Sequence, residues 1–106
     1  MSQPSGGVPP YRVVYSQRCR EATTDLLTRA AARQRFAEVA LALRGIHTRL
    51  QWIPLDFGEP LRDFVHLHMK IFIGALAPLA VRYGVDEANR IVYVVLPFDL
   101  LPRSGL

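Results

Sequence analysis

The chain has 106 residues, 50% of them hydrophobic and 21% charged, which excludes a disordered polypeptide and predicts one globular domain with a single core. Its one cysteine, Cys19, excludes a disulfide framework within the chain. No apolar stretch reaches the about 18–20 residues of a membrane span, and the first residues lack a signal-peptide pattern, so we expect a cytoplasmic protein with no membrane association.

The charge of the chain bears on its partners. The net charge is +4 at pH 7, and Lys70 is the only lysine among the 13 Lys and Arg residues. Arginine forms flat, bidentate contacts with carboxylates and phosphates. The charge therefore favours an acidic protein partner or a nucleic acid, while an ordinary solvated surface explains it equally well.

The N-terminal region divides into a lead-in and a first strand. Residues 1–10 are rich in Pro, Gly and Ser, which predicts a flexible segment ahead of a domain over 11–102, with a short tail over 103–106. Residues 11–16, "YRVVYS", are β-branched and aromatic and predict the first strand.

Residues 18–50 have the apolar spacing of helices, with a break predicted near 33–34. The first predicted helix is rich in Ala, Leu and Arg and lacks Gly and Pro. The second predicted helix carries a single stripe at spacings of three and four: Phe36, Val39, Ala40, Leu43, Ile46, His47 and Leu50. This stripe predicts packing against a sheet, with His47 hydrogen-bonded and partly buried. Gly45 permits close approach of another element, and Pro54 ends the helix.

After a loop that contains Gly58 and Pro60, the apolar residues alternate as in strands. The sequence predicts strands over 61–73, 79–85 and 91–98, with a turn over 74–78 and a polar loop over 86–90. The element order is therefore β-α-α-β-β-β. We expect an α+β fold in which two N-terminal helices pack on one face of a four-stranded antiparallel sheet.

Three basic residues alternate with apolar ones in the strand predicted over 61–73: His66, His68 and Lys70. Alternate side chains of a strand point to the same face. The apolar residues that would face the helices are Leu67, Met69, Ile71 and Ile73. The basic row would then lie on the face that the helices leave uncovered.

Three interpretations of this basic row remain open. The first is general-base chemistry, in which a neutral histidine takes a proton from a ribose hydroxyl and Lys70 balances the charge of a phosphate. The second is a zinc site, which needs a third ligand such as Asp63 or Glu59. The third is the ordinary wet face of an antiparallel sheet. We expect no metal or other cofactor.

Three stretches resemble the RelE/ParE superfamily of toxins from type II toxin–antitoxin systems: "YRVVYS" (11–16), "GEPLRDF" (58–64) and "VRYGVDEANRIVYVV" (81–95). The resemblance implies the fold order above and a cognate antitoxin as partner. For activity it implies a ribosome-dependent mRNA endoribonuclease. The alternatives are a ParE-like, non-catalytic inhibitor of DNA gyrase and a degenerate protein-binding module of the same fold.

The same resemblance implies which residues would act on RNA. His66 and His68 stand by register where ribosome-dependent members often carry Arg or Lys, and Arg82 lies two residues after the position of the usual arginine. The predicted catalytic residues are therefore His66, His68 and Arg82. The predicted nucleic-acid-binding residues are Lys70, Arg62 and Arg103. The family's basic C-terminus is here "LPFDLLPRSGL", which leaves the nuclease set incomplete, a gap that counts less against a gyrase inhibitor.

Overall fold

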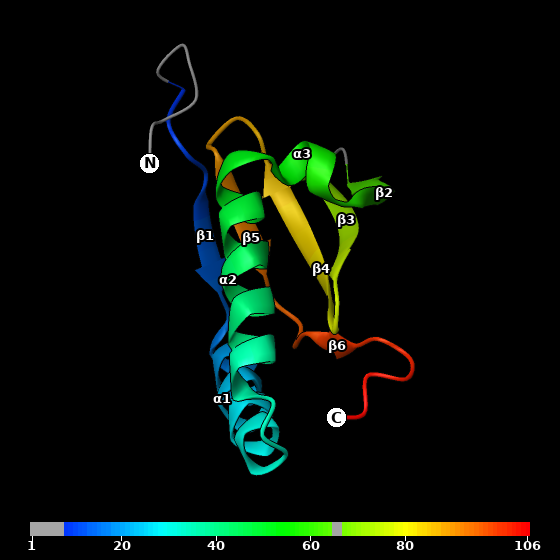
Figure 1. Cartoon of the computed structure of the whole chain (residues 1–106). Coiled ribbons are helices and arrows are strands. Elements are labelled where there is room, and N and C mark those ends of the chain that lie inside the picture. Colours follow the sequence, from blue (N-terminus) through cyan, green and yellow to red (C-terminus); the bar gives the residue numbers. More distant parts are fainter. Residues whose placement is uncertain (1–7, 65–66) are drawn as a thin grey trace.

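The computed structural model describes residues 8–64 and 67–106, which form three helices and six strands (Figure 1). In chain order these are β1 (Arg12–Tyr15), α1 (Gln17–Ala32), α2 (Phe36–Trp52), α3 (Pro54–Phe57), β2 (Glu59–Phe64), β3 (Met69–Leu76), β4 (Leu79–Asp86), β5 (Ile91–Val94) and β6 (Asp99–Leu100). No helix among these described residues combines the length and hydropathy of a membrane span.

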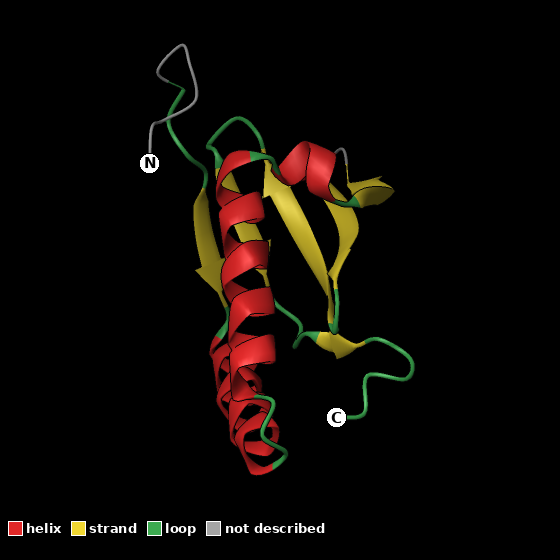
Figure 2. Ribbon diagram, viewed as in Figure 1, coloured by secondary structure: helices red, strands yellow, loops and turns green. Residues whose placement is uncertain are grey.

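The strands form one sheet in the order β1-β5-β4-β3-β2, with β6 paired to β4 (Figure 2). Helix α2 lies across one face of the sheet, where it contacts β1, β3 and β4, and α1 packs against α2. The predicted α+β class, with the helices on one face, is confirmed. We call the face under α2 the helix face and the opposite one the open face.

Helix α1 begins at a residue that caps it. The Ser16 Oγ accepts a hydrogen bond from the Cys19 N–H at 3.0 Å, which satisfies one of the unpaired amides of the first turn. The helix ends at Ala32, and Gln34 has a φ of 60°, in the left-handed region that a helix does not use. The predicted break between the two helices is confirmed.

Helix α2 supplies much of the core through its apolar stripe. Val39, Ile46 and Leu50 are fully buried, whereas Phe36, predicted to belong to the stripe, is 50% exposed. A Cβ on Gly45 would come within 2.6 Å of the Leu76 Cδ2, so the helix and β3 approach closely at the glycine, as predicted.

The single strand predicted over 61–73 is wrong. The segment folds as two antiparallel strands, β2 and β3, joined by a turn in which His68 has a φ of 51°. Histidine is among the residues that tolerate this left-handed conformation better than most, so the turn forms without a glycine. Residues 65 and 66 of this connection lie outside the described residues.

The predicted orientation of β3 is also wrong. Phe72, only 4% exposed, stacks on the buried Tyr83 of β4 with ring centroids 5.4 Å apart, on the helix face. By alternation Met69 and Ile71 therefore lie on the open face, and Lys70 belongs to the same side as Phe72.

The sheet is larger and more mixed than predicted. Among the described residues it has six strands rather than four, because the 61–73 segment supplies two and residues 99–100 supply another. Strand β1 pairs in parallel with β5, in the register Val13 with Val92, while every other pairing is antiparallel. The last predicted strand ends at Val94 rather than at residue 98.

Candidate functional site

The open face of the sheet lies opposite the helices, which leave it uncovered. The strand registers place one set of residues on it, drawn from five strands: Arg12, Val14, Glu59, Arg62, Phe64, Met69, Ile71, Ile73, Ala75, Ala80, Arg82, Gly84, Asp86, Ile91 and Tyr93. Most members of this set are apolar. The face therefore differs from the polar outer face that a one-sided antiparallel sheet normally presents to water.

A groove of about 420 Å³ runs across this face. Its lining residues include Leu61, Phe64, Leu67, Met69, Ile71, Tyr93, Val95 and Leu96, together with Arg62 and Arg82. Several of them are apolar side chains in water: Leu67 is 57% exposed and Val95 59%. We call this the open-face groove.

The floor of the open-face groove depends on a glycine. A Cβ on Gly84 of β4 would come within 2.8 Å of the Met69 Sδ and 3.2 Å of the Ile71 Cδ1. The absence of a side chain there lets these two residues of β3 lie down over β4. The floor is consequently thioether and aliphatic carbon, without a hydrogen-bonding group of its own.

Two arginines bring positive charge to this apolar groove. The Arg62 guanidinium lies over the Phe64 ring, 5.7 Å from its centroid, and Arg82 Nη2 is 3.3 Å from the Asp99 Oδ2. Arg82 and Asp99 are each about half exposed. The groove thus pairs apolar contact area with guanidinium groups that remain accessible to an anionic ligand.

The structure brings together only some of the predicted site residues. Arg62 and Arg82 both line the open-face groove, whereas Arg103 is exposed in a turn after β6 with a φ of 64°. His66 lies outside the described residues. The remaining two, His68 and Lys70, lie elsewhere on the molecule.

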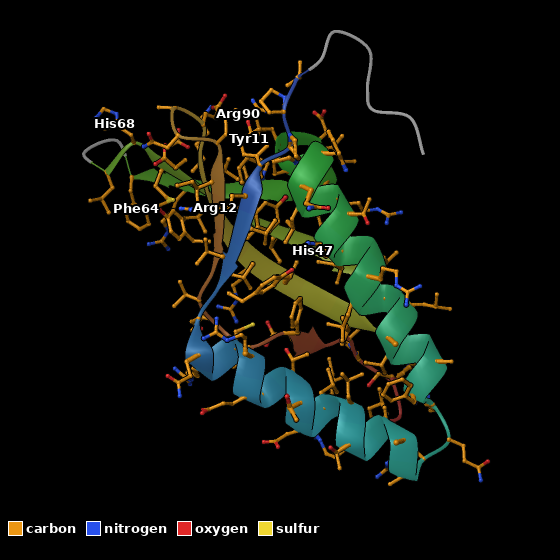
Figure 3. The ribbon with its side chains drawn as sticks, turned by 90° about the vertical axis from the view of Figure 1, so that its left-hand side faces the viewer. Tyr11, Arg12, His47, Phe64, His68 and Arg90 are labelled. Atoms are coloured by element: carbon orange, nitrogen blue, oxygen red, sulfur yellow. The ribbon has the colours of Figure 1, made fainter. Side chains whose placement is uncertain are left out.

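His68 and Lys70 line a separate hollow of about 330 Å³ at the end of the β2–β3 hairpin, together with Asp63 and Glu87. Lys70 Nζ is 3.0 Å from the Glu87 Oε1, and this hydrogen bond raises the pKa of the Lys70 ammonium. Figure 3 shows His68 at this end, on the hairpin. Neither group lines the open-face groove with Arg82, so His68, Lys70 and Arg82 do not gather at one site as predicted.

The histidine of α2 has a structural environment. His47 Nδ1 is 2.8 Å from the Tyr15 hydroxyl of β1, and the two rings stack with centroids 5.7 Å apart. Burial, followed by the nearby Cys19 thiol, raises the pKa of Tyr15 to about 12. The predicted hydrogen-bonded, partly buried His47 is confirmed.

Metal binding finds no support among the residues that the structure describes. Within 8–64 and 67–106, no three His, Cys, Asp or Glu side chains gather closely enough to hold an ion. Asp63 lies near His68, but Glu59 stands at the other end of β2.

Sequence reasoning did not single out Tyr93, Val95 and the apolar floor of the groove. The signal was present in β5 and the residue after it, where Ile91, Tyr93 and Val95 alternate with Val92 and Val94. Because both sets are apolar, the alternation predicts two buried faces or one buried face and one binding face. The structure shows that Val92 and Val94 are fully buried while Val95 is exposed.

Comparison with known proteins finds a likeness at the level of structure. No family model and no curated protein matches the sequence. The crystal structure of the toxin–antitoxin complex RelBE2 from Mycobacterium tuberculosis contains a chain that superposes with a TM-score of 0.62, over 88% of this chain and 93% of that one, at 21% identity. This chain has a RelE/ParE-like fold. The resemblance carried by the three sequence stretches is thereby confirmed at the level of the fold.

The likeness concerns the fold of the chain and not its activity. At 21% identity the likeness is one of architecture, and a fold alone does not assign an activity. What the chain can do follows from its own open-face groove, which is apolar and carries Arg62 and Arg82.

Proposed function

We propose that this protein is the toxin-like component of a type II toxin–antitoxin system and that it acts by binding a protein target in the open-face groove. The observation that supports this is the composition of the groove. It is lined by apolar and aromatic side chains and two arginines, and no His, Asp or Glu of the described residues lines it.

Chemical and physical reasons favour protein binding over RNA cleavage. A general base must lie within hydrogen-bond reach of the proton it removes, and His68 lines the hairpin hollow instead of the groove. Protein interfaces are built around buried aromatic and aliphatic side chains with Tyr and Arg as the strongest contributors. Tyr93, Arg62 and Arg82 supply those residue types here. DNA gyrase is the candidate target that the family resemblance supplies.

A cognate antitoxin is the second partner that we propose. The similar chain from Mycobacterium tuberculosis was crystallised in a toxin–antitoxin complex. The net charge of +4 on this chain suits an acidic segment that folds on binding. Co-expression with the product of a neighbouring small gene tests this partner, and formation of a stable complex that relieves growth arrest is the expected result.

The target-binding role is tested by placing a charge in the groove. Val95→Glu puts a carboxylate on an exposed apolar wall of the groove, and we expect it to abolish growth arrest on expression in bacteria. Leu41→Glu, on α2 and 63% exposed, makes the same chemical change away from the groove and should leave arrest intact. Arrest that persists in Val95→Glu would count against the open face as the binding surface.

A ribosome-dependent mRNA endoribonuclease is the second candidate. The two arginines and the Tyr93 hydroxyl on one face are groups that can hold a phosphate. The combined change of His66 and His68 to Ala tests this function together with mapping of cellular mRNA ends. Loss of arrest and of new mRNA ends would support the nuclease. Growth arrest without new mRNA ends, together with a DNA-damage response, would support gyrase as the target. If the unmodified protein causes no growth arrest, the protein-binding module is the function that remains.

A further inference from the structure

Asp99 is the acidic residue that the fold places against an arginine of the open-face groove. Strand β6 pairs with the start of β4, with Asp99 opposite Ala80 and Leu100 opposite Leu79. Because Ala80 and Arg82 are two residues apart on one strand, both lie on the open face. Asp99, which pairs with Ala80, therefore lies beside Arg82 on that face. The Asp99 Oδ2 lies 3.3 Å from the Arg82 Nη2.

The backbone on both sides of Asp99 is anchored. Phe98 lies against Tyr15, with ring centroids 6.4 Å apart, and Leu100 packs against the core. The Leu101 N–H donates to the Pro78 carbonyl at 2.9 Å. The carboxylate is therefore held near the guanidinium by strand pairing and packing, at a smaller entropic cost than a pair of free surface side chains would require.

Asp99 is held beside Arg82, yet another carboxylate can take its place. Both side chains are about half exposed, so water and ligands reach them, and an ion pair of this kind is weak. A carboxylate on a partner that enters the groove would meet a guanidinium already occupied by Asp99. The Arg62 guanidinium, by contrast, lies over an aromatic ring.

We infer that Asp99 sets the affinity of the open-face groove for an acidic protein segment, by acting as an internal counter-ion of Arg82 that the incoming carboxylate must displace. The inference rests on the proposed function and names the chemistry of the partner: a segment with apolar residues for the groove floor and a carboxylate for Arg82. Asp99 is a positioning residue in this account, because it acts through Arg82.

The test measures binding of a fluorescein-labelled peptide of alternating Glu and Leu to the purified full chain. We expect Asp99→Asn to tighten binding about two- to fivefold, the range that corresponds to an exposed ion pair. Asp25→Asn, an exposed position on α1, makes the same change of net charge and should have a clearly smaller effect. Arg82→Gln should weaken binding, and Asp99→Asn should have no further effect in that background.

A second measurement covers the case in which Asp99→Asn disturbs β6. In the unmodified protein, nuclear magnetic resonance of the Arg82 guanidinium and the Asp99 carboxylate should show both signals moving together as the peptide is added. Any of four outcomes would overturn the inference. Asp99→Asn and Asp25→Asn could have equal effects, or the effect of Asp99→Asn could persist with Arg82→Gln. No variant could bind the peptide, or the Asp99 signal could stay in place as the peptide is added. These readouts use no growth assay, so they stay separate from the Val95→Glu test of the proposed function.

Discussion

Tyr83 links three regions of the chain through a single side chain. Its hydroxyl donates to the Pro54 carbonyl at 2.6 Å and accepts from the Gly58 N–H at 2.9 Å. Its ring is stacked between Phe57 and Phe72, with centroids 6.1 Å and 5.4 Å away. The residue therefore fixes α3 and the start of β2 to the centre of the sheet, and with them one wall of the open-face groove.

We expect Tyr83→Phe to lower the free energy of unfolding by about 1–3 kcal/mol, because the buried Pro54 carbonyl and the partly buried Gly58 amide each lose their partner while the ring is kept. Urea unfolding followed by far-ultraviolet circular dichroism measures the change. Tyr93→Phe removes a tyrosine hydroxyl from the open face and should change the free energy of unfolding by less than about 0.5 kcal/mol. Equal effects of the two substitutions would show that the Tyr83 hydroxyl has no special structural role.

The orientation of β3 shows why the sequence pattern led to a wrong prediction. Alternation of apolar side chains identifies the residues that share a face but not which face the helices cover. In β3 both sets are suited to burial, since Met69 and Ile71 alternate with Phe72 and Gly74. The set that faces the helices is the one that contains Gly74, because a Cβ on Gly74 would lie 2.5 Å from the Phe57 Cε2 of α3. That close contact depends on α3, which local sequence did not predict.

At the scale of elements, the start of α1 is tied to the end of β5 by one hydroxyl. The Ser16 Oγ accepts from the Cys19 N–H and donates to the Val95 carbonyl at 2.5 Å. We expect Ser16→Ala to destabilise the protein by about 0.5–2 kcal/mol through loss of the cap. Thermal unfolding measures the effect.

The control for this prediction is a second hydroxyl of α1. Thr24 donates to the Arg20 carbonyl at 3.2 Å within the exposed middle of the helix, where Ala has the higher helix propensity. Thr24→Ala should therefore be neutral or slightly stabilising. If Thr24→Ala lost as much stability as Ser16→Ala, the destabilisation would come from losing a hydroxyl group in general and not from losing the cap.

The elements that were predicted correctly are those with strong local signals. The two helices have a sustained apolar period, and the β4–β5 hairpin has the polar loop 86–90 between two β-branched runs. The β2–β3 hairpin was missed because 65–68 reads "VHLH", without the Gly, Pro, Asn or Asp that usually marks a turn. The parallel pairing of β1 with β5 joins segments almost 80 residues apart, a distance over which local pattern carries no information.

At the scale of the whole molecule, apolar surface is concentrated on the face without helices. Of the nine large hydrophobic residues that are exposed among those the structure describes, Leu61, Leu67, Val95 and Leu96 line the open-face groove. Contiguous exposed apolar surface of this kind marks interaction sites, whereas scattered residues such as Leu41 do not. The fold thus turns one side of the sheet to the core and leaves the other side exposed and apolar, as the proposed binding of a partner requires.

The whole fold also has a predictable response to alkaline pH, to which two buried tyrosines contribute. Burial raises the pKa of Tyr83 to about 12, and burial together with the Cys19 thiol raises the pKa of Tyr15 to about 12. An unfolded tyrosine ionises near pH 10. The folded state therefore holds these protons more tightly than the unfolded state, so the associated stability is complete below about pH 10 and is lost as the pH rises towards about 12.

Burial also raises the pKa of the Cys19 thiol, so we expect the free energy of unfolding, measured with urea, to begin to fall above about pH 8.5 and to fall more steeply above about pH 10. The double variant Tyr15→Phe/Tyr83→Phe should start less stable and lose much less over the same range. Lys70, whose pKa Glu87 raises, loses its ion pair as the pH passes its folded pKa, so it accounts for some of the remaining slope. Lys70→Gln measures that contribution. An alkaline slope unchanged in the double Phe variant would mean that other groups govern the transition, and that neither hydroxyl is as shielded from water as its packing implies.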